Sequence, residues 1–78
     1  VTNLQKATVF FSKASHVQEK LAGEFPDNPE YVRQWARTLT NLGNTWRAKG
    51  ERDAAVGSLR QAIELQTKLV AASPKVPE

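Results

Sequence analysis

Residues 41–46 read Asn-Leu-Gly-Asn-Thr-Trp and sit inside a run of residues that otherwise favours a helix. Gly43, in the interior of that run, costs about 1 kcal/mol of helix propensity relative to alanine. A helix accepts such a residue where a neighbouring element packs too closely to leave room for a side chain. Gly43 therefore predicts that another helix packs against the side of its own helix on which Gly43 lies.

Two clusters of turn residues divide the 78-residue chain into three predicted helices. A loop with the sequence Phe-Pro-Asp-Asn-Pro-Glu starts the middle helix, because Asn28 can cap it and Pro29 suits the first helical position. Gly50 is expected to end that helix in a left-handed conformation, and Ser73-Pro74 to end the last one. The predicted helices span about residues 4–24, 29–49 and 52–72. No segment alternates with period two, so no strand is predicted.

The middle helix has one apolar and one polar side. Its apolar residues, which fall within about 80° of one another, are Tyr31, Trp35, Leu39, Leu42 and Trp46. The polar residues on the opposite side are Arg33, Arg37, Thr40, Asn44 and Arg47, with Asn41 beside them. The first side is predicted to pack in the core, and the second to face water or a ligand.

Apolar residues of the first and third helices spread over about half of each circumference, which predicts packing against neighbours on two sides. In the first helix they are Leu4, Ala7, Phe10, Phe11, Ala14, Val17 and Leu21. In the third they are Ala55, Val56, Leu59, Ala62, Ile63, Leu65, Leu69 and Val70.

These two helices are related by an internal repeat with a period of 48 residues. Residues 14–30 align without gaps on residues 62–78. The matches include Ala14 with Ala62, Gln18 with Gln66, Lys20 with Lys68, Leu21 with Leu69, and Pro26, Pro29 and Glu30 with Pro74, Pro77 and Glu78. Such a repeat is typical of a helical solenoid, in which successive units bury one another's apolar faces.

The residues Leu39, Leu42, Gly43, Trp46, Ala55, Leu59 and Ala62 follow one another at spacings of 3, 1, 3, 9, 4 and 3. This pattern resembles the tetratricopeptide repeat over residues 36–69, with residues 1–25 as half of another repeat. Two departures are the period of 48 and Thr67, which stands where a closing proline is common. The chain then reads as a fragment: the second helix of one repeat (1–25), a complete helix pair (29–73) and the start of the next repeat (74–78).

The resemblance implies an all-α solenoid of three antiparallel helices, in which Gly43 lets the two helices of a pair approach and Ala55 and Ala62 are its small partners. It implies a non-catalytic protein–protein interaction or scaffold module whose middle helix lines a peptide groove. Some members of the family grip a terminal carboxylate with asparagine and basic residues. The groove candidates are Arg33, Arg37, Thr40, Asn41, Asn44 and Arg47, and the expected ligand is an acidic or carboxylate-terminated peptide.

A narrower resemblance rests on Glu19-Lys20-Leu21, the Phe-Pro-Asp loop start and the Asn-Leu-Gly-Asn stretch. Long repeats of this kind are similar to those of bacterial proteins, including regions attached to serine/threonine kinase-like proteins. The alternative function is therefore a spacer or regulatory region of a larger kinase-related protein whose catalytic domain is not in this chain.

Composition argues against other classes of function. The chain has no cysteine, a single histidine (His16) and no glycine-rich phosphate loop, so no enzyme activity, metal site or cofactor is predicted. Its net charge of +3 is concentrated on the middle helix, but Trp35 and Trp46 lie away from the arginines there, unlike the interleaved aromatics of single-strand nucleic-acid binders. No apolar run is long enough to span a membrane, and the lack of cysteine suits a cytoplasmic location.

Self-association is the remaining expectation. The first and third helices each lack a neighbour on one side, so apolar residues there would be bare. Dimerisation through Phe10, Val17, Ile63 or Val70 would then follow from excision of the fragment.

Overall fold

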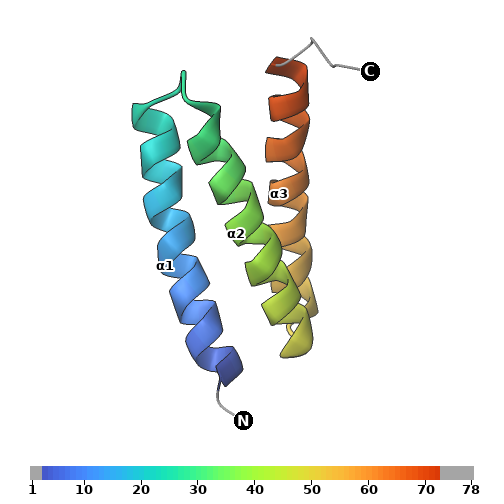
Figure 1. Cartoon of the computed structure of the whole chain (residues 1–78). Helices are drawn as coiled ribbons and strands as arrows, with labels where there is room; N and C mark the ends of the chain where they lie inside the picture. Colours follow the sequence, from blue (N-terminus) through green and yellow to red (C-terminus); the bar gives the residue numbers. More distant parts are fainter. Residues whose placement is uncertain (1–2, 73–78) are drawn as a thin grey trace.

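A computed structural model describes residues 3–72 as three helices joined by two short loops (Figure 1). The helices are α1 (Asn3–Glu24), α2 (Pro29–Ala48) and α3 (Arg52–Ala72). The predicted all-α fold is confirmed, and each predicted helix boundary is correct to within one residue. The predicted helix stop at Ser73-Pro74 and the predicted start of a further repeat at 74–78 lie outside the described residues.

The ends of α2 are set by the turn residues that mark them in the sequence. Asn28 is the N-cap, and its side-chain oxygen accepts a hydrogen bond from the backbone N–H of Glu30 at 3.0 Å. Pro29 is the first helical residue, where its missing N–H leaves no helical bond unmade. At the other end Gly50 has φ +87° and donates its N–H to the carbonyl of Arg47 at 3.0 Å. Both turn predictions are confirmed.

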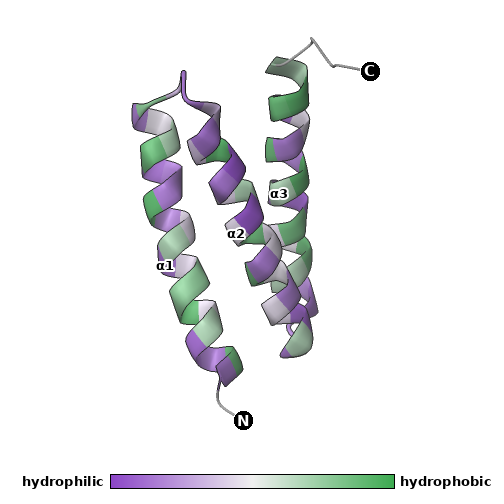
Figure 2. Ribbon diagram, viewed as in Figure 1, coloured by the Kyte–Doolittle hydropathy of each residue, from purple (hydrophilic) through white to green (hydrophobic). Residues whose placement is uncertain are grey.

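α2 lies between the other two helices and packs against both, while α1 and α3 do not approach each other (Figure 1). The molecule measures 44 × 26 × 19 Å, so it is a single layer of helices rather than a closed bundle. Within residues 3–72 α1 and α3 each have α2 as their one neighbour, so each lacks the second neighbour, as the sequence predicts. Their remaining apolar residues stay exposed, among them Phe10, Val17, Ile63 and Val70. Figure 2 shows apolar residues around much of α3 and a mostly hydrophilic visible side of α2.

The core of this layer is built mainly from small residues. Ala36 and Leu39 of α2 form a buried cluster with Ala62 and Leu65 of α3. Of the five apolar residues predicted to form the core side of α2, the two leucines are buried and the three aromatic residues are half-buried. The prediction that the three aromatic residues lie in the core is therefore corrected. A single layer of helices cannot cover large rings on every side.

Gly43 is buried on the side of α2 that faces Ala55 and Leu59 of α3. A Cβ atom added there would lie 2.6 Å from Leu59 Cγ and 3.3 Å from the backbone oxygen of Ala55. The close approach predicted from this glycine is confirmed. Of its two predicted partners, Ala55 lies next to Gly43 and Ala62 does not, and the Leu59 side chain fills the space together with the Ala55 backbone. Ala62 instead packs in the cluster with Leu39.

Candidate functional site

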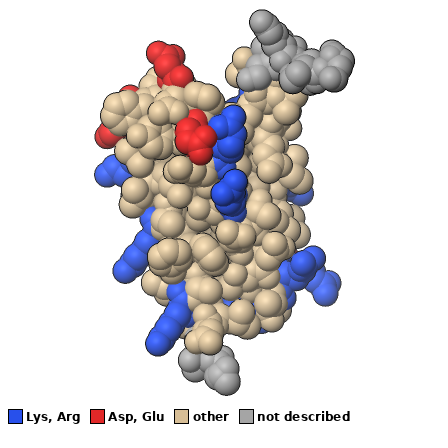
Figure 3. Space-filling model, viewed as in Figure 1, with Lys and Arg blue, Asp and Glu red and all other residues tan. Residues whose placement is uncertain are grey.

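The polar face of α2 consists of the six residues that the sequence indicates as groove candidates. They are Arg33, Arg37, Thr40, Asn41, Asn44 and Arg47, and all except the half-buried Thr40 are exposed. Because α1 and α3 pack against the other sides of α2, this face is left open to solvent. Figure 3 shows basic side chains in the middle of the visible surface, with acidic side chains gathered near the loop between α1 and α2.

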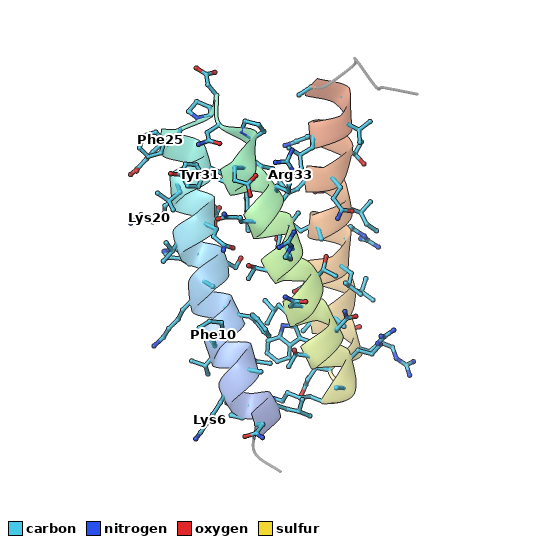
Figure 4. All side chains as sticks on the ribbon, viewed as in Figure 1. Lys6, Phe10, Lys20, Phe25, Tyr31 and Arg33 are labelled. Carbon is cyan, nitrogen blue, oxygen red and sulfur yellow. The ribbon has the colours of Figure 1, made fainter. Side chains whose placement is uncertain are left out.

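Charge on the polar face is partly neutralised at one end. Arg33, near the N-terminal end of α2 (Figure 4), donates from Nη1 to Glu30 Oε1 at 2.7 Å. Both side chains are about half exposed, so this pair contributes only about 0–1 kcal/mol to stability. Within residues 3–72 no carboxylate lies within ion-pair distance of Arg37 or Arg47. The positive charge open to a ligand therefore lies toward the middle and C-terminal end of α2.

Polar groups on this face differ in whether they already form hydrogen bonds within the protein. Thr40 donates its hydroxyl to the backbone oxygen of Ala36 at 3.0 Å, so this donor is occupied. Arg47 Nη2 donates to Asn44 Oδ1 at 3.4 Å, a long and weak hydrogen bond. In the part of the chain that is described, the side-chain amide of Asn41 has no partner. Arg37, Asn41 and the amide N–H groups of Asn44 are thus the donors best placed to meet a ligand.

The two tryptophans of α2 pack toward α1 and not on the polar face. Trp35 Nε1 donates to Ser15 Oγ at 3.1 Å. Lys49 Nζ lies 5.2 Å from the centre of the Trp46 ring and donates to Gln5 Oε1 of α1 at 2.8 Å. At the α1–α2 turn, Phe25 and Tyr31 lie against each other (Figure 4), with ring centres 5.6 Å apart. Aromatic residues therefore contribute packing and offer no stacking surface beside Arg37.

A cleft of about 500 Å³ on another side of α2 was missed by sequence reasoning. It lies among the C-terminal ends of α1 and α3 and the N-terminal end of α2, and is lined mainly by apolar residues. Val32 and Trp35 of α2 face it, from the side of that helix away from Arg37. The one sequence signal for it is the small residues Ala22 and Gly23, which leave room between diverging helices.

Metal-binding groups do not converge in residues 3–72. No three side chains of His, Cys, Asp or Glu come together there as a ligand set. His16 is exposed on α1. None of the described helices combines the length and the apolar character needed to cross a membrane.

The α2–α3 pair matches a known protein family. The family model described as a tetratricopeptide repeat matches residues 35–73, which is half of the chain. The chain belongs to the tetratricopeptide repeat family. The match covers all of α3 and most of α2, so it contains both sides of the Gly43 contact. Membership of the tetratricopeptide repeat family indicates a protein–protein interaction module. No curated protein and no solved structure matches the chain.

Proposed function

We propose that this chain is a non-catalytic interaction or scaffold module, and that the polar face of α2 receives an acidic or carboxylate-terminated peptide. The observation that carries the proposal is the exposure of Arg37 and Asn44 on one open face, with no carboxylate near Arg37 among residues 3–72. In this proposal residues 1–25 are the second helix of one repeat, residues 29–73 a complete pair and residues 74–78 the start of another.

The chemistry of the polar face suits a carboxylate. A guanidinium group such as that of Arg37 can bind both oxygens of a carboxylate at once. Asn41 and Asn44 add neutral N–H donors within about 10 Å along the helix, a distance that a few residues of extended peptide can span. Because these groups are exposed, their attraction to a peptide is screened by salt.

The test is a binding measurement with the 78-residue chain and fluorescent peptides that carry a free or an amidated C-terminus. Fluorescence anisotropy at low and raised ionic strength is expected to show binding that needs the free carboxylate and weakens with salt. Arg37→Ala/Asn44→Ala is expected to lower the affinity by about tenfold or more, as loss of a charge-assisted contact does. Circular dichroism verifies that the variant is folded.

The matched control is Arg60→Ala/Gln61→Ala, which removes one exposed arginine and one exposed side-chain amide from α3. This variant is expected to bind as the unchanged chain does. Equal losses in both variants would mean that net charge alone attracts the peptide. No binding to any peptide by a folded chain would favour the alternative role, a spacer or regulatory region of a serine/threonine kinase-related protein.

Self-association of the 78-residue chain, as a property and not as a function, is a second proposal that the exposed apolar residues favour. Phe10 of α1 and Val70 of α3 are each 66% exposed, on helices that have only α2 as a neighbour in the described residues. Phe10 lies seven residues from the exposed Val17 on α1, and Val70 lies seven residues from the exposed Ile63 on α3, and contiguous exposed apolar patches mark interaction surfaces. The absence of cysteine suits a reducing compartment, and we place the protein in the cytoplasm.

A further inference from the structure

The apolar cleft among the C-terminal ends of α1 and α3 and the N-terminal end of α2 has the size and the lining of a binding site. Its volume of about 500 Å³ falls within the range of about 300–1,000 Å³ that is common for ligand sites. All but two of its lining residues are uncharged, and Val32 and Trp35 are those that α2 contributes beside Pro29. The cleft lies on the side of α2 away from Arg37, so it is a different surface from the polar face.

Small residues keep the cleft open. Gly23 lines it from α1, and a Cβ atom added there would meet nothing within 4 Å. Ala22 beside it and Ala72 in the last turn of α3 contribute only a methyl group each. Glycine in a helix costs about 1 kcal/mol of propensity, and no close contact requires Gly23 as one requires Gly43. The space at Gly23 is therefore available to the side chain of a partner.

The cleft is also distinct from the bare apolar sides of the outer helices. The exposed residues Phe10 and Val17 of α1 lie outside its lining, and so do Ile63 and Val70 of α3. Self-association through those four residues therefore does not use the cleft.

Two opposite charges stand on different walls of the cleft. Glu19 comes from α1 and Lys68 from α3, the two helices on either side of α2 (Figure 1). Both side chains are exposed, and neither forms an ion pair within residues 3–72. A ligand that complements both walls carries a positive group toward Glu19, a negative group toward Lys68 and apolar groups between them.

We infer that this cleft docks a peptide segment in which apolar side chains are flanked by a basic residue on one side and an acidic residue on the other. The apolar side chains fill the space at Gly23 and pack on Trp35. The basic residue faces Glu19, and the acidic residue faces Lys68. Membership of an interaction family favours a peptide over a small molecule as the occupant. The inference does not rest on peptide binding by the polar face, which lies on another side of α2.

The test measures the binding of three fluorescent peptides to the 78-residue chain by anisotropy. Each peptide contains three leucines and is capped at both ends, and the residues that flank the leucines are Lys and Glu, Glu and Glu, or Lys and Lys. We expect the Lys/Glu peptide to bind about threefold to fivefold more tightly than the other two, as exposed ion pairs contribute. The net charge of +3 alone would favour the Glu/Glu peptide. A preference for that peptide would overturn the proposed chemistry.

A charge reversal tests the wall that α3 provides. Lys68→Glu makes both charged residues of the cleft acidic, and is expected to shift the preference to the Lys/Lys peptide. The matched control is Lys6→Glu, which makes the same change at an exposed position of α1 outside the cleft. This control is expected to keep the preference for the Lys/Glu peptide. The same shift in both variants would mean that net charge, and not the cleft, selects the peptide.

A filled cleft tests where the peptide lies. Gly23→Leu is expected to weaken binding of the Lys/Glu peptide by at least about tenfold, because the added side chain takes the space of the peptide. Gly57→Leu makes the same change on α3 outside the cleft, also with nothing within 4 Å of an added Cβ atom, and is expected to bind as the unchanged chain does. Circular dichroism verifies that both variants are folded. Equal binding by the two variants would overturn the docking site.

The polar face is tested separately with the same capped peptide. Arg37→Ala/Asn44→Ala is expected to leave binding of the Lys/Glu peptide unchanged, because this peptide has no terminal carboxylate and the cleft lies on another side of α2. A loss of binding in that variant would place the peptide on the polar face and overturn its assignment to the cleft.

Discussion

At the scale of single residues, Gly43 is the clearest case of a residue type required by helix packing. Its missing side chain is matched by Leu59, whose Cγ would lie 2.6 Å from an added Cβ atom. The propensity gained by replacing glycine with alanine is about 1 kcal/mol, whereas overpacking a well-filled site costs about 1–3 kcal/mol. Packing therefore outweighs propensity at this position, and glycine is the residue that fits.

Gly43→Ala is accordingly expected to lower the free energy of unfolding by about 1 kcal/mol, and Gly43→Leu to unfold the chain. In a Leu59→Ala background the added methyl group has room, so Gly43→Ala should become neutral or stabilising there. Urea denaturation followed by circular dichroism measures all four members of this double-mutant cycle.

Gly57→Ala is the matched control, since Gly57 lies in α3 with nothing within 4 Å of an added Cβ atom. It should raise the free energy of unfolding by about 0.5–1 kcal/mol, because only the propensity changes. If Gly43→Ala stabilised the chain as much as Gly57→Ala does, the packing explanation of Gly43 would be wrong.

At the scale of elements, the boundaries of the helices could be predicted from sequence because the signals are local. Asn28, Pro29 and Gly50 each act within a turn of themselves, and all three have the predicted conformations. Burial could not be predicted as well, because it depends on which neighbours are present. Trp35 and Trp46 were predicted to form the core and are only half-buried, whereas Thr38 gave no core signal and is buried. The residues of the polar face were located correctly, and their peptide-binding role remains a prediction.

The N-cap of α2 gives a prediction at this scale. Asn28→Ala removes the acceptor for the Glu30 N–H at the start of the one helix that both others pack against. We expect a loss of about 1 kcal/mol in the free energy of unfolding, measured by urea denaturation. Asn41→Ala makes the same chemical change inside α2 at an exposed position, and should be neutral or slightly stabilising. Equal losses in the two variants would show that Asn28 does not act as a cap.

At the scale of the whole molecule, the bare sides of α1 and α3 decide how the chain behaves in solution. Phe10 and Val17 lie on one outer helix, and Ile63 and Val70 on the other. The 78-residue chain therefore offers apolar surface on both of its outer helices, with α2 between them. Neither side is needed for the α2–α3 contact that the family match covers.

We expect the average mass from light scattering to rise above 8.7 kDa as the concentration of the 78-residue chain increases, because exposed apolar side chains associate. Ile63→Glu should reduce this rise, since it places a charge among the exposed apolar residues of α3. Gln61→Glu adds the same charge elsewhere on α3 and should leave the rise unchanged. A mass that stays at the monomer value throughout would contradict self-association.

The separation of α1 from α3 has a consequence for the rate at which the chain folds. Within residues 3–72, every contact between helices joins elements that are neighbours in sequence, across loops at residues 25–28 and 49–51. Closing such short loops takes little entropy, and helical proteins with local contacts fold in about microseconds to milliseconds. No slow pairing of distant segments is required. Each outer helix can therefore detach from α2 and return while the other stays in place, whereas unfolding of α2 releases both.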